Sequence, residues 1–433
     1  MDKKIINIKY NFYDFWKYLP ILVFIFSPKI DIISIPNFWQ GIRLDDIVIL
    51  LYLIYFFVSN NFRIFPNLVN KEIFGFNWIL FLPYLLLSMF IGKIYFLDPK
   101  WIIAARYIEY IGLIIILNQI NPNKDKILLL FKVYILINFF VVLLQYFEFF
   151  GGFTSRGNCI AEIKNIESFC FDKEDIKNIC FFSCDLGFMK NYVLPGGFLN
   201  NRVPGITGGV WELSINLSIC IYALILFEKK INKVFPYVLL TILMLLIAQS
   251  RGIIFGFIAG SIFFIKDYKK TIKILLYSLI FIVLIYLLNL FNFKQIIHDR
   301  FVIDYITLIK IIFGAFANSL PPQSEVYGTG LESMWYRAYT WEQSISDLKK
   351  SYVLSIFGSG GSLIYTESLL IRVLTSFGIV GTIIIVYLSR NLPLFFIVFV
   401  LVTGITVDMF VSFKIFVFSC LLLMIYKKKI SFK

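Results

Sequence analysis

Long runs of apolar residues are the feature that most constrains what this chain can fold into. Residues 127–147, 234–249, 274–291 and 415–426 are almost uninterrupted Leu, Ile, Val and Phe. A helix needs about 20 apolar residues to cross the roughly 30 Å hydrocarbon core of a bilayer. Open strands in lipid would leave backbone groups unpaired, so helices are expected. Because 59% of the 433 residues are hydrophobic, the sequence predicts an all-α polytopic membrane protein.

The apolar runs divide into about twelve candidate transmembrane helices. They are expected over residues 19–35, 44–60, 74–92, 101–118, 127–149, 206–227, 234–249, 252–266, 274–291, 369–388, 393–407 and 409–426. Every second loop between them is rich in Lys and Arg, and the alternate short loops carry few. The positive-inside rule then puts both termini in the cytoplasm. The whole chain, 1–433, is expected to form a single integral membrane domain, with no cleavable signal peptide evident.

The net charge of +14 follows from the same Lys-rich loops. The chain has neither zinc-finger spacing nor an isolated basic domain, so no nucleic-acid partner is expected. A Walker loop, an HExxH motif and a nucleophile elbow are also missing from the sequence. With a single histidine, His298, a His-rich metal site is excluded. The sequence therefore calls for no metal and no cofactor.

Two long segments fall on the outer side of the membrane, over roughly 150–205 and 292–368. The first contains four of the six cysteines, namely Cys159, Cys170, Cys180 and Cys184. In an exported loop they suggest two disulfides that brace it, with three connectivities open. A zinc site is the alternative, because two of these cysteines are close in sequence. The remaining cysteines, Cys220 and Cys420, lie in expected spans.

The second outer segment is expected to contain amphipathic helices. Residues 296–316 mix apolar positions with charges, which suits a helix lying in the membrane interface. His298 belongs to this stretch and is interpreted as an interfacial residue. Residues 331–350 form the second candidate helix, with Met334, Ala338 and Trp341 on one side. The sequence FGSGGS at 357–362 follows as a flexible turn.

Charges inside or at the mouths of the expected spans are costly in lipid and call for an explanation. Arg106 and Glu109 are one helical turn apart, so a self-neutralising pair is one reading. A group of others maps to the outer ends of spans, where they could share one outward-facing site: Glu212, Arg251, Glu367 and Arg372.

Arginine stays charged and grips phosphate oxygens with two parallel hydrogen bonds. A lipid pyrophosphate at the headgroup level would meet a cluster of outward-facing arginines. The candidates are Arg202, Arg251, Arg337 and Arg372. Trp211 and Tyr336 add aromatic surface beside such charges, for stacking on sugars or for interfacial anchoring. Taken singly, each arginine could instead be an interface or folding charge.

Four stretches carry a family resemblance. They are WQGIRLDDIVIL at 39–50, NNRVPGITGGVWELSINLSI at 200–219, LIAQSRGIIFGFIAG at 246–260, and 336–381, which runs from YRAYTW through FGSGG to FGIVG. The chain resembles the O-antigen polymerase (Wzy) and O-antigen ligase superfamily. That resemblance implies a glycosyltransferase-C-like membrane fold in a bacterial inner membrane.

Within that superfamily, ligases typically show a His-Asn pair in the polar motif before the late span. The matching stretch here is Tyr365-Thr366-Glu367-Ser368, and polymerases more often show an acidic residue there. The resemblance therefore implies a repeat-unit polymerase of O-antigen or another surface polysaccharide. It would transfer a growing glycan from undecaprenyl pyrophosphate to another lipid-linked repeat, with its active site facing the periplasm.

The implied site has three catalytic residues. Arg337 and Arg372 would neutralise the charge that develops on the leaving pyrophosphate. Glu367 would act as general base on the acceptor hydroxyl. Glu212 is a second candidate for the base, and a structural pairing of Glu367 with Arg372 is the alternative. The partners expected are the undecaprenyl-pyrophosphate-linked oligosaccharide, membrane lipid and a chain-length regulator.

Two other functions stay open. The first is an O-antigen ligase, which hands the glycan to lipid A-core. The second is a non-enzymatic polysaccharide flippase or transporter. Transporters show internal repeats, broken helices and charges at mid-span. The long outer loops and the polar residues at span ends argue against that class here.

Overall fold

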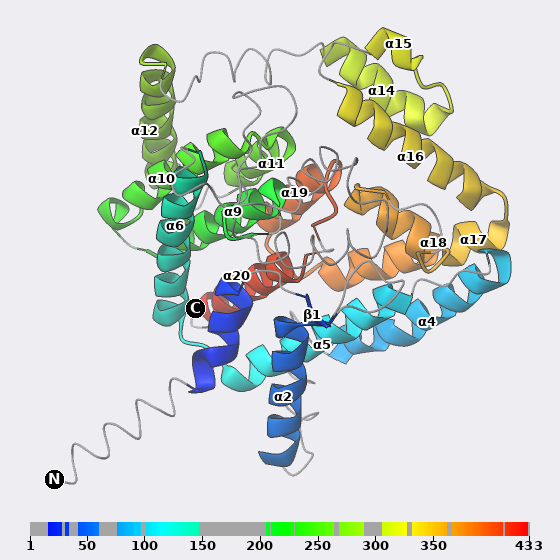
Figure 1. Ribbon diagram of the computed structural model, residues 1–433, viewed down its shortest axis with the longest axis horizontal. Coiled ribbons are helices and arrows are strands. Elements are labelled where there is room, and N and C mark those ends of the chain that lie inside the picture. Colours follow the sequence, from blue (N-terminus) through cyan, green and yellow to red (C-terminus); the bar gives the residue numbers. More distant parts are fainter. Residues whose placement is uncertain are drawn as a thin grey trace, which may run out of the picture. The chain divides into compact units, whose positions relative to one another are not determined.

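The computed structural model of this chain describes residues 16–27, 31–33, 42–59, 76–96, 101–146, 205–207, 209–228, 230–263, 268–289, 305–326, 331–361, 366–409 and 412–431. In these ranges the regular structure is helical, with one exception. A short antiparallel ribbon joins β1 (Asp31–Ile33) to β2 (Ile42–Arg43). Figure 1 shows the arrangement of the helices. The all-helical class is confirmed for the described part of the chain.

Eleven of the expected spans each correspond to one helix, whose ends differ from the expected ones by up to six residues. These helices are α2 (Leu44–Ser59), α4 (Phe76–Phe96), α5 (Trp101–Ile120), α6 (Lys124–Tyr146), α9 (Val210–Phe227), α10 (Phe235–Ala248), α11 (Arg251–Ile262), α12 (Tyr268–Leu287), α18 (Leu369–Ser389), α19 (Leu394–Gly404) and α20 (Phe413–Ser431). The remaining expected span, the first in the chain at 19–35, is wrong at its C-terminal end. The helix there covers Trp16–Phe26, and a strand follows at Asp31. Pro28, Lys29 and Asp31 interrupt the apolar run, and a proline cannot continue a helical hydrogen-bond ladder.

Three helices in the described ranges are long and apolar enough to cross a membrane. They cover Lys124–Leu144, Val210–Phe227 and Leu369–Ser389. Several apolar helices are shorter, among them α10, α11 and α19. Large apolar side chains are exposed along many helices, for instance Leu51 on α2, Ile280 on α12 and Ile383 on α18. Such surfaces are compatible with a helical protein embedded in a membrane. The number of twelve spans stays a prediction.

The chain divides into two compact units. The first unit comprises Met1–Leu68, Gly112–Ala248 and Phe413–Lys433. The second comprises Val69–Ile111 and Gln249–Ser412. Helix α5 begins in the second unit and ends in the first. A single membrane domain over the whole chain stays a prediction.

The core of the first unit forms around α9, which is buried on nearly all sides. Helices α6, α10 and α20 contact it. Phe418 of α20 packs against the rings of Phe131 and Tyr134 on α6. A helix that is buried all round is expected to be apolar all round, and α9 largely is. Its Cys220 and the Cys420 of α20 are both buried and free.

In the second unit, the described residues between α12 and α18 form four helices. They are α14 (Tyr305–Ala317), α15 (Gln323–Val326), α16 (Glu332–Lys349) and α17 (Tyr352–Phe357). Helix α14 packs along α16, as Figure 1 shows. The helix predicted at 331–350 is confirmed, and its predicted apolar side is the one that packs: Met334, Ala338 and Trp341 join the same buried cluster. For the stretch predicted at 296–316, the helix that the structure describes begins at Tyr305.

The segment 357–361 differs from the flexible turn that its glycines predict. It packs into a break in α18, where Gly378 has a φ of 64° and a non-helical ψ. The backbone N–H groups of Ser359 and Gly360 donate to the carbonyls of Thr375 and Ser376, over 2.9 and 2.8 Å. A side chain on Gly378 would collide with the backbone at Ile356 and Gly358. These glycines therefore permit close packing of two backbones rather than free motion.

Helix α4 supplies the other partners of this break. The hydroxyl of Tyr84 donates to the carbonyl of Phe377 over 2.7 Å. The hydroxyl of Ser88 donates to the carbonyl of Phe357 over 2.6 Å. Carbonyls without a helical partner are costly in a nonpolar environment, and side-chain hydroxyls from a neighbouring helix satisfy them. Hydrogen bonds from α4 therefore stabilise the break in α18.

Candidate functional site

The first element of the candidate site is an ion pair between α16 and the start of α18. Arg337 projects from the second turn of α16 and pairs with the carboxylate of Glu367. Glu367 directly precedes Ser368, the N-cap of α18, whose side chain accepts a hydrogen bond from the backbone N–H of Ile371. Both members of the pair are accessible, with 31% of the Arg337 side chain and 54% of the Glu367 side chain exposed. An exposed pair of this kind can exchange partners at small cost.

The second element is a buried ion pair one helical turn further on. Arg372, in the first turn of α18, donates to the carboxylate of Asp408, which lies four residues beyond the end of α19. The Asp408 side chain is 2% exposed, whereas the Arg372 side chain is 25% exposed. A carboxylate in such surroundings needs a close cation to remain charged. The pairing of Glu367 with Arg372 that the sequence left open is therefore not what the structure has. Each of these two residues pairs with a different partner.

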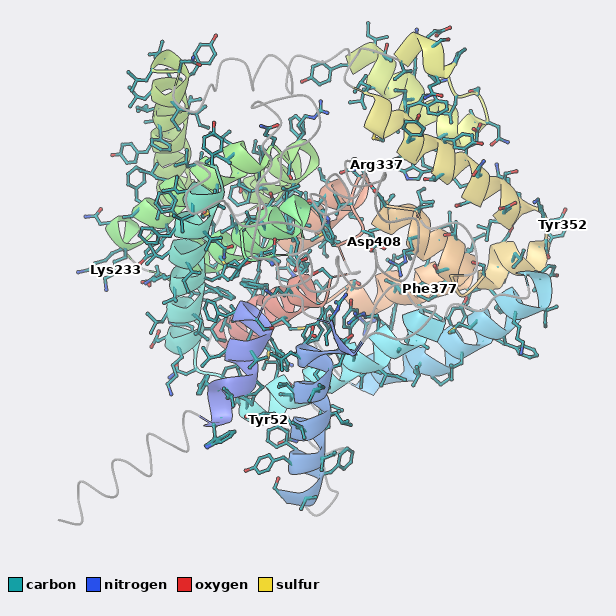
Figure 2. The ribbon with its side chains drawn as sticks, viewed as in Figure 1. Tyr52, Lys233, Arg337, Tyr352, Phe377 and Asp408 are labelled. Carbon is teal, nitrogen blue, oxygen red and sulfur yellow. The ribbon has the colours of Figure 1, made fainter. Side chains whose placement is uncertain are left out.

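The hydroxyl of Ser368 joins the two elements to α19. It donates to the carbonyl of Gly404 over 3.0 Å. Gly404 also lies close to the side chain of Leu369, where an added methyl group would stand 3.3 Å away. The N-terminal end of α18 and the C-terminal end of α19 are therefore in direct contact. Figure 2 labels Arg337 and Asp408, which come from α16 and from the segment after α19.

Helix α11 brings a third arginine toward this region. Arg251 is its first residue, directly after the N-cap Ser250. The next residue, Gly252, packs against the side chain of Thr406, and Gly256 one turn later packs against Thr403. The two helices therefore run antiparallel in close contact, with glycines where the backbones approach. This packing brings the start of α11 to the segment that ends in Asp408.

Other predicted site residues lie elsewhere. Trp211 and Glu212 belong to α9 of the first unit, where the Glu212 side chain is fully buried. Tyr336 lies on α16 next to Arg337, and its exposed hydroxyl accepts a hydrogen bond from the Gln323 side chain over 2.6 Å. The predicted residues outside the described ranges are Arg202 and the disulfide candidates Cys159, Cys170, Cys180 and Cys184.

The pair predicted between Arg106 and Glu109 is present on α5. Sequence reasoning missed two buried charged residues, Asp408 and Lys414. Lys414 is the second residue of α20 in the first unit, and its ammonium group donates to the carbonyl of Ile206 over 3.3 Å. Both residues stand in a nearly uncharged stretch between Arg390 and Lys427. An acidic and a basic residue isolated in such a stretch are the sequence feature that could have identified these two buried charges. Buried charges in apolar surroundings require partners.

The chemistry available at this end of the second unit is that of guanidinium and carboxylate groups. Arginines supply fixed positive charge and forked donors, which suit phosphate oxygens. The exposed carboxylate of Glu367 can accept a proton when Arg337 turns to another anion. Among the described residues, no group of three or more His, Cys, Asp or Glu side chains is arranged to hold a metal ion.

Comparison of the chain with family models, with curated protein sequences and with solved structures gave no match.

Proposed function

We propose that this chain is a membrane glycosyltransferase that polymerises lipid-linked oligosaccharide repeat units of a bacterial surface polysaccharide. One observation carries the proposal. Arg372 lies in the first turn of α18, Arg337 pairs with Glu367 just before that helix, and Arg251 begins α11, whose next residue packs on Thr406. A cluster of arginines at a helix end in an apolar protein suits a lipid-borne diphosphate.

The predicted membrane topology supports this reading independently. Alternation of loop charge puts the starts of α11 and α18 and the end of α19 on the same outer side. The packing of Gly252 on Thr406, and of Ser368 on Gly404, joins those same three ends. Two lines of argument, one from charge and one from packing, thus agree on which ends belong together. In the proposal the site faces the periplasm and both termini are cytoplasmic.

The proposed reaction needs no nucleotide and no metal, because the lipid diphosphate is already an activated leaving group. The acceptor hydroxyl attacks the anomeric carbon, and the bond from that carbon to the diphosphate oxygen breaks. The hydroxyl proton passes to the carboxylate of Glu367, and undecaprenyl pyrophosphate leaves. Arg337 and Arg372 stabilise the negative charge that develops on it.

In this scheme, the ion pair between Arg337 and Glu367 is the state of the site before the diphosphate binds. When the diphosphate binds Arg337, it displaces the carboxylate of Glu367, which then becomes available as a base. The exposure of both side chains allows that exchange. The buried carboxylate of Asp408 meanwhile keeps Arg372 in place. Glu212, the second candidate for the base, lies in the first unit and is fully buried.

One observation favours a second candidate, a polysaccharide flippase. Helix α18 is broken at Gly378, and discontinuous helices are common at the substrate sites of transporters. In the glycosyltransferase proposal, the break instead orients the half of α18 that carries Arg372.

Deletion of the gene separates these functions on a gel of the surface polysaccharide. Loss of a polymerase leaves a single repeat on the lipid core. Loss of a ligase leaves no attached repeats and lets lipid-linked polymer accumulate outside the inner membrane. Loss of a flippase traps single repeats on the cytoplasmic side. Either of the last two results would overturn the proposal, and complementation with the intact gene is the control.

A further inference from the structure

Three aromatic rings lie together on the side of α16 that faces away from its buried cluster. The rings of Trp335 and Tyr339 are stacked, with centroids 5.5 Å apart and planes that differ by 6°. The ring of Tyr336 meets the ring of Trp335 edge-on, also at a centroid distance of 5.5 Å. Tyr336 and Tyr339 are 54% and 41% exposed. We refer to these three rings as the aromatic shelf.

The chain between α14 and α16 holds the aromatic shelf in place. The indole N–H of Trp335 donates to the carbonyl of Pro321 over 2.8 Å, and Trp335 packs partly against the buried cluster of these two helices. The side-chain amide of Gln323 donates to the hydroxyl of Tyr336 over 2.6 Å. Side chains that are ordered before a ligand arrives lose less conformational freedom when it binds. The aromatic shelf is therefore preorganised as a binding surface.

Polar side chains share this side of α16 with the rings. Gln343 lies four residues after Tyr339, and Ser346 lies seven residues after it, so all three belong to one stripe of the helix. Ser346 is exposed and Gln343 is half-buried. Ring faces with amide and hydroxyl groups beside them suit a ligand that presents C–H groups on one side and hydroxyls at its edges. Sugars have this chemistry.

The exposed side of α14 has a different composition. It presents Ile306, Ile309, Phe313 and Phe316, which recur at helical spacing and are between 48% and 69% exposed. An apolar stripe of this kind suits the acyl chains of a membrane. The aromatic shelf lies among polar groups instead, so its chemistry favours a hydroxylated ligand over a lipid.

The aromatic shelf adjoins the site proposed for the diphosphate. Tyr336 directly precedes Arg337 on α16, and Arg337 pairs with Glu367, the proposed base. In the proposed function, the glycan is joined to the diphosphate that Arg337 binds. Sugars close to that diphosphate would therefore lie within reach of Tyr336 and of the rings beside it.

We propose that the aromatic shelf binds a sugar ring of the lipid-linked oligosaccharide. The inference rests on the proposed function and deepens it, because it gives the glycan a binding site beside the arginines that bind the diphosphate. Tyr339 stacks on the C–H face of the sugar, and the side chains of Tyr336 and Gln323 hydrogen-bond its hydroxyls. Trp335 is a positioning residue, since it holds both tyrosine rings.

The test measures binding of a labelled oligosaccharide to the full-length protein in detergent by fluorescence polarisation. The probe is prepared by partial hydrolysis of the surface polysaccharide from the strain that carries the gene. Tyr339→Ala is expected to weaken binding of this probe by about tenfold, because a stacking contact is lost. Binding of farnesyl diphosphate, which reports on the arginines, should stay unchanged in the same variant. Thermal unfolding of the same samples identifies any variant that fails to fold.

Tyr339→Phe is the informative counterpart. It keeps the ring and removes only the hydroxyl, so it should bind the oligosaccharide nearly as well as the parent protein. The matched control is Tyr352→Ala, because Tyr352 lies on α17, outside the aromatic shelf, and is 90% exposed. Figure 2 labels this residue. The control variant should also bind like the parent protein.

Two results would overturn the inference. The first is that the oligosaccharide fails to bind the parent protein, or binds the parent and Tyr339→Ala equally well. The second is equal loss of binding in Tyr339→Ala and Tyr352→Ala, which would indicate a general effect of exposed rings, such as anchoring in the membrane. The measurement does not depend on glycan polymerisation. A deletion strain with an unchanged polysaccharide ladder would therefore refute the proposed function while leaving the aromatic shelf to be judged by binding.

Discussion

Asp408 and Arg372 form an ion pair in which the Asp408 side chain is almost completely buried and the Arg372 side chain is partly exposed. The two residues are 36 positions apart in sequence. They meet because the start of α18 packs against the end of α19 through Ser368 and Gly404. The pair therefore ties the arginine most central to the proposed chemistry to the helix packing of the second unit.

Removal of Asp408 should be strongly destabilising. Asp408→Ala leaves Arg372 without its carboxylate in apolar surroundings, at an expected cost of about 3 kcal/mol. The double variant Arg372→Leu/Asp408→Leu should recover most of that stability and still give no polymer. Thermal unfolding in detergent and the polysaccharide ladder are the two measurements. Lys350→Gln, in an exposed pair with Asp347, is the control and should change stability by less than about 1 kcal/mol.

A substitution in the exposed pair of Arg337 and Glu367 should have little effect on stability and a large effect on chain growth. Arg337→Gln is expected to cost less than about 1 kcal/mol of stability, because both side chains are accessible to solvent. It should nevertheless reduce chain growth by about 100-fold, since a donor to the developing charge is lost. Glu342→Gln, also on α16, is the control. A normal ladder with Arg337→Gln would remove this residue from the mechanism.

The break in α18 should not tolerate a side chain. Gly378→Ala forces a β-carbon against backbone atoms of Ile356 and Gly358, at a φ of 64° that side chains rarely adopt. The expected loss of stability is about 2 kcal/mol or more. Gly404→Ala serves as the control, because the three atoms nearest to its added methyl group belong to the side chain of Leu369 and stand at 3.3 Å or more. Equal melting temperatures for the two variants would contradict the backbone contact.

The contact between α11 and α19 offers a fourth prediction. Gly256→Leu would press a side chain into Thr403 and the carbonyl of Phe399, so the two helices must separate. Because Arg251 begins α11, its distance from the start of α18 would change as well. The variant should lose chain growth even if the protein still inserts into the membrane. Ile258→Ala, on the exposed side of α11, should keep the ladder.

Much of the fold follows from the sequence because apolar runs and helix length are local properties. The helix at 331–350 could be assigned with its buried side, since Met334 and Trp341 recur at helical spacing. The end of the first helix was harder to predict, because its apolar run continues past the point where the helix ends. The segment 357–361 was misjudged for a different reason. Its glycines indicate unusual backbone, but whether that backbone is free or packed depends on a helix that follows it.

The candidate site was less predictable than the fold. The expected topology put Glu367 and Arg372 at the outer ends of spans, and Arg337 was predicted as an outward-facing arginine. It could not decide which acid pairs with which base, because Glu367 and Asp408 lie 30 and 36 residues from their partners. Asp408 was overlooked because loop charge was used to orient the chain, and acidic residues contribute little to that rule. The pairing is a property of how α16, α18 and α19 pack.

A helix broken in two has two dipoles in place of one. The first piece of α18 begins at Leu369, so its partial positive charge lies beside Arg372 and adds to the attraction for an anion there. The second piece begins after Gly378 and brings another positive end to the middle of the helix. The ring of Tyr84 lies at that point, next to Gly381. The hydroxyl of this tyrosine donates to the carbonyl of Phe377, at the negative end of the first piece, while its ring covers the start of the second.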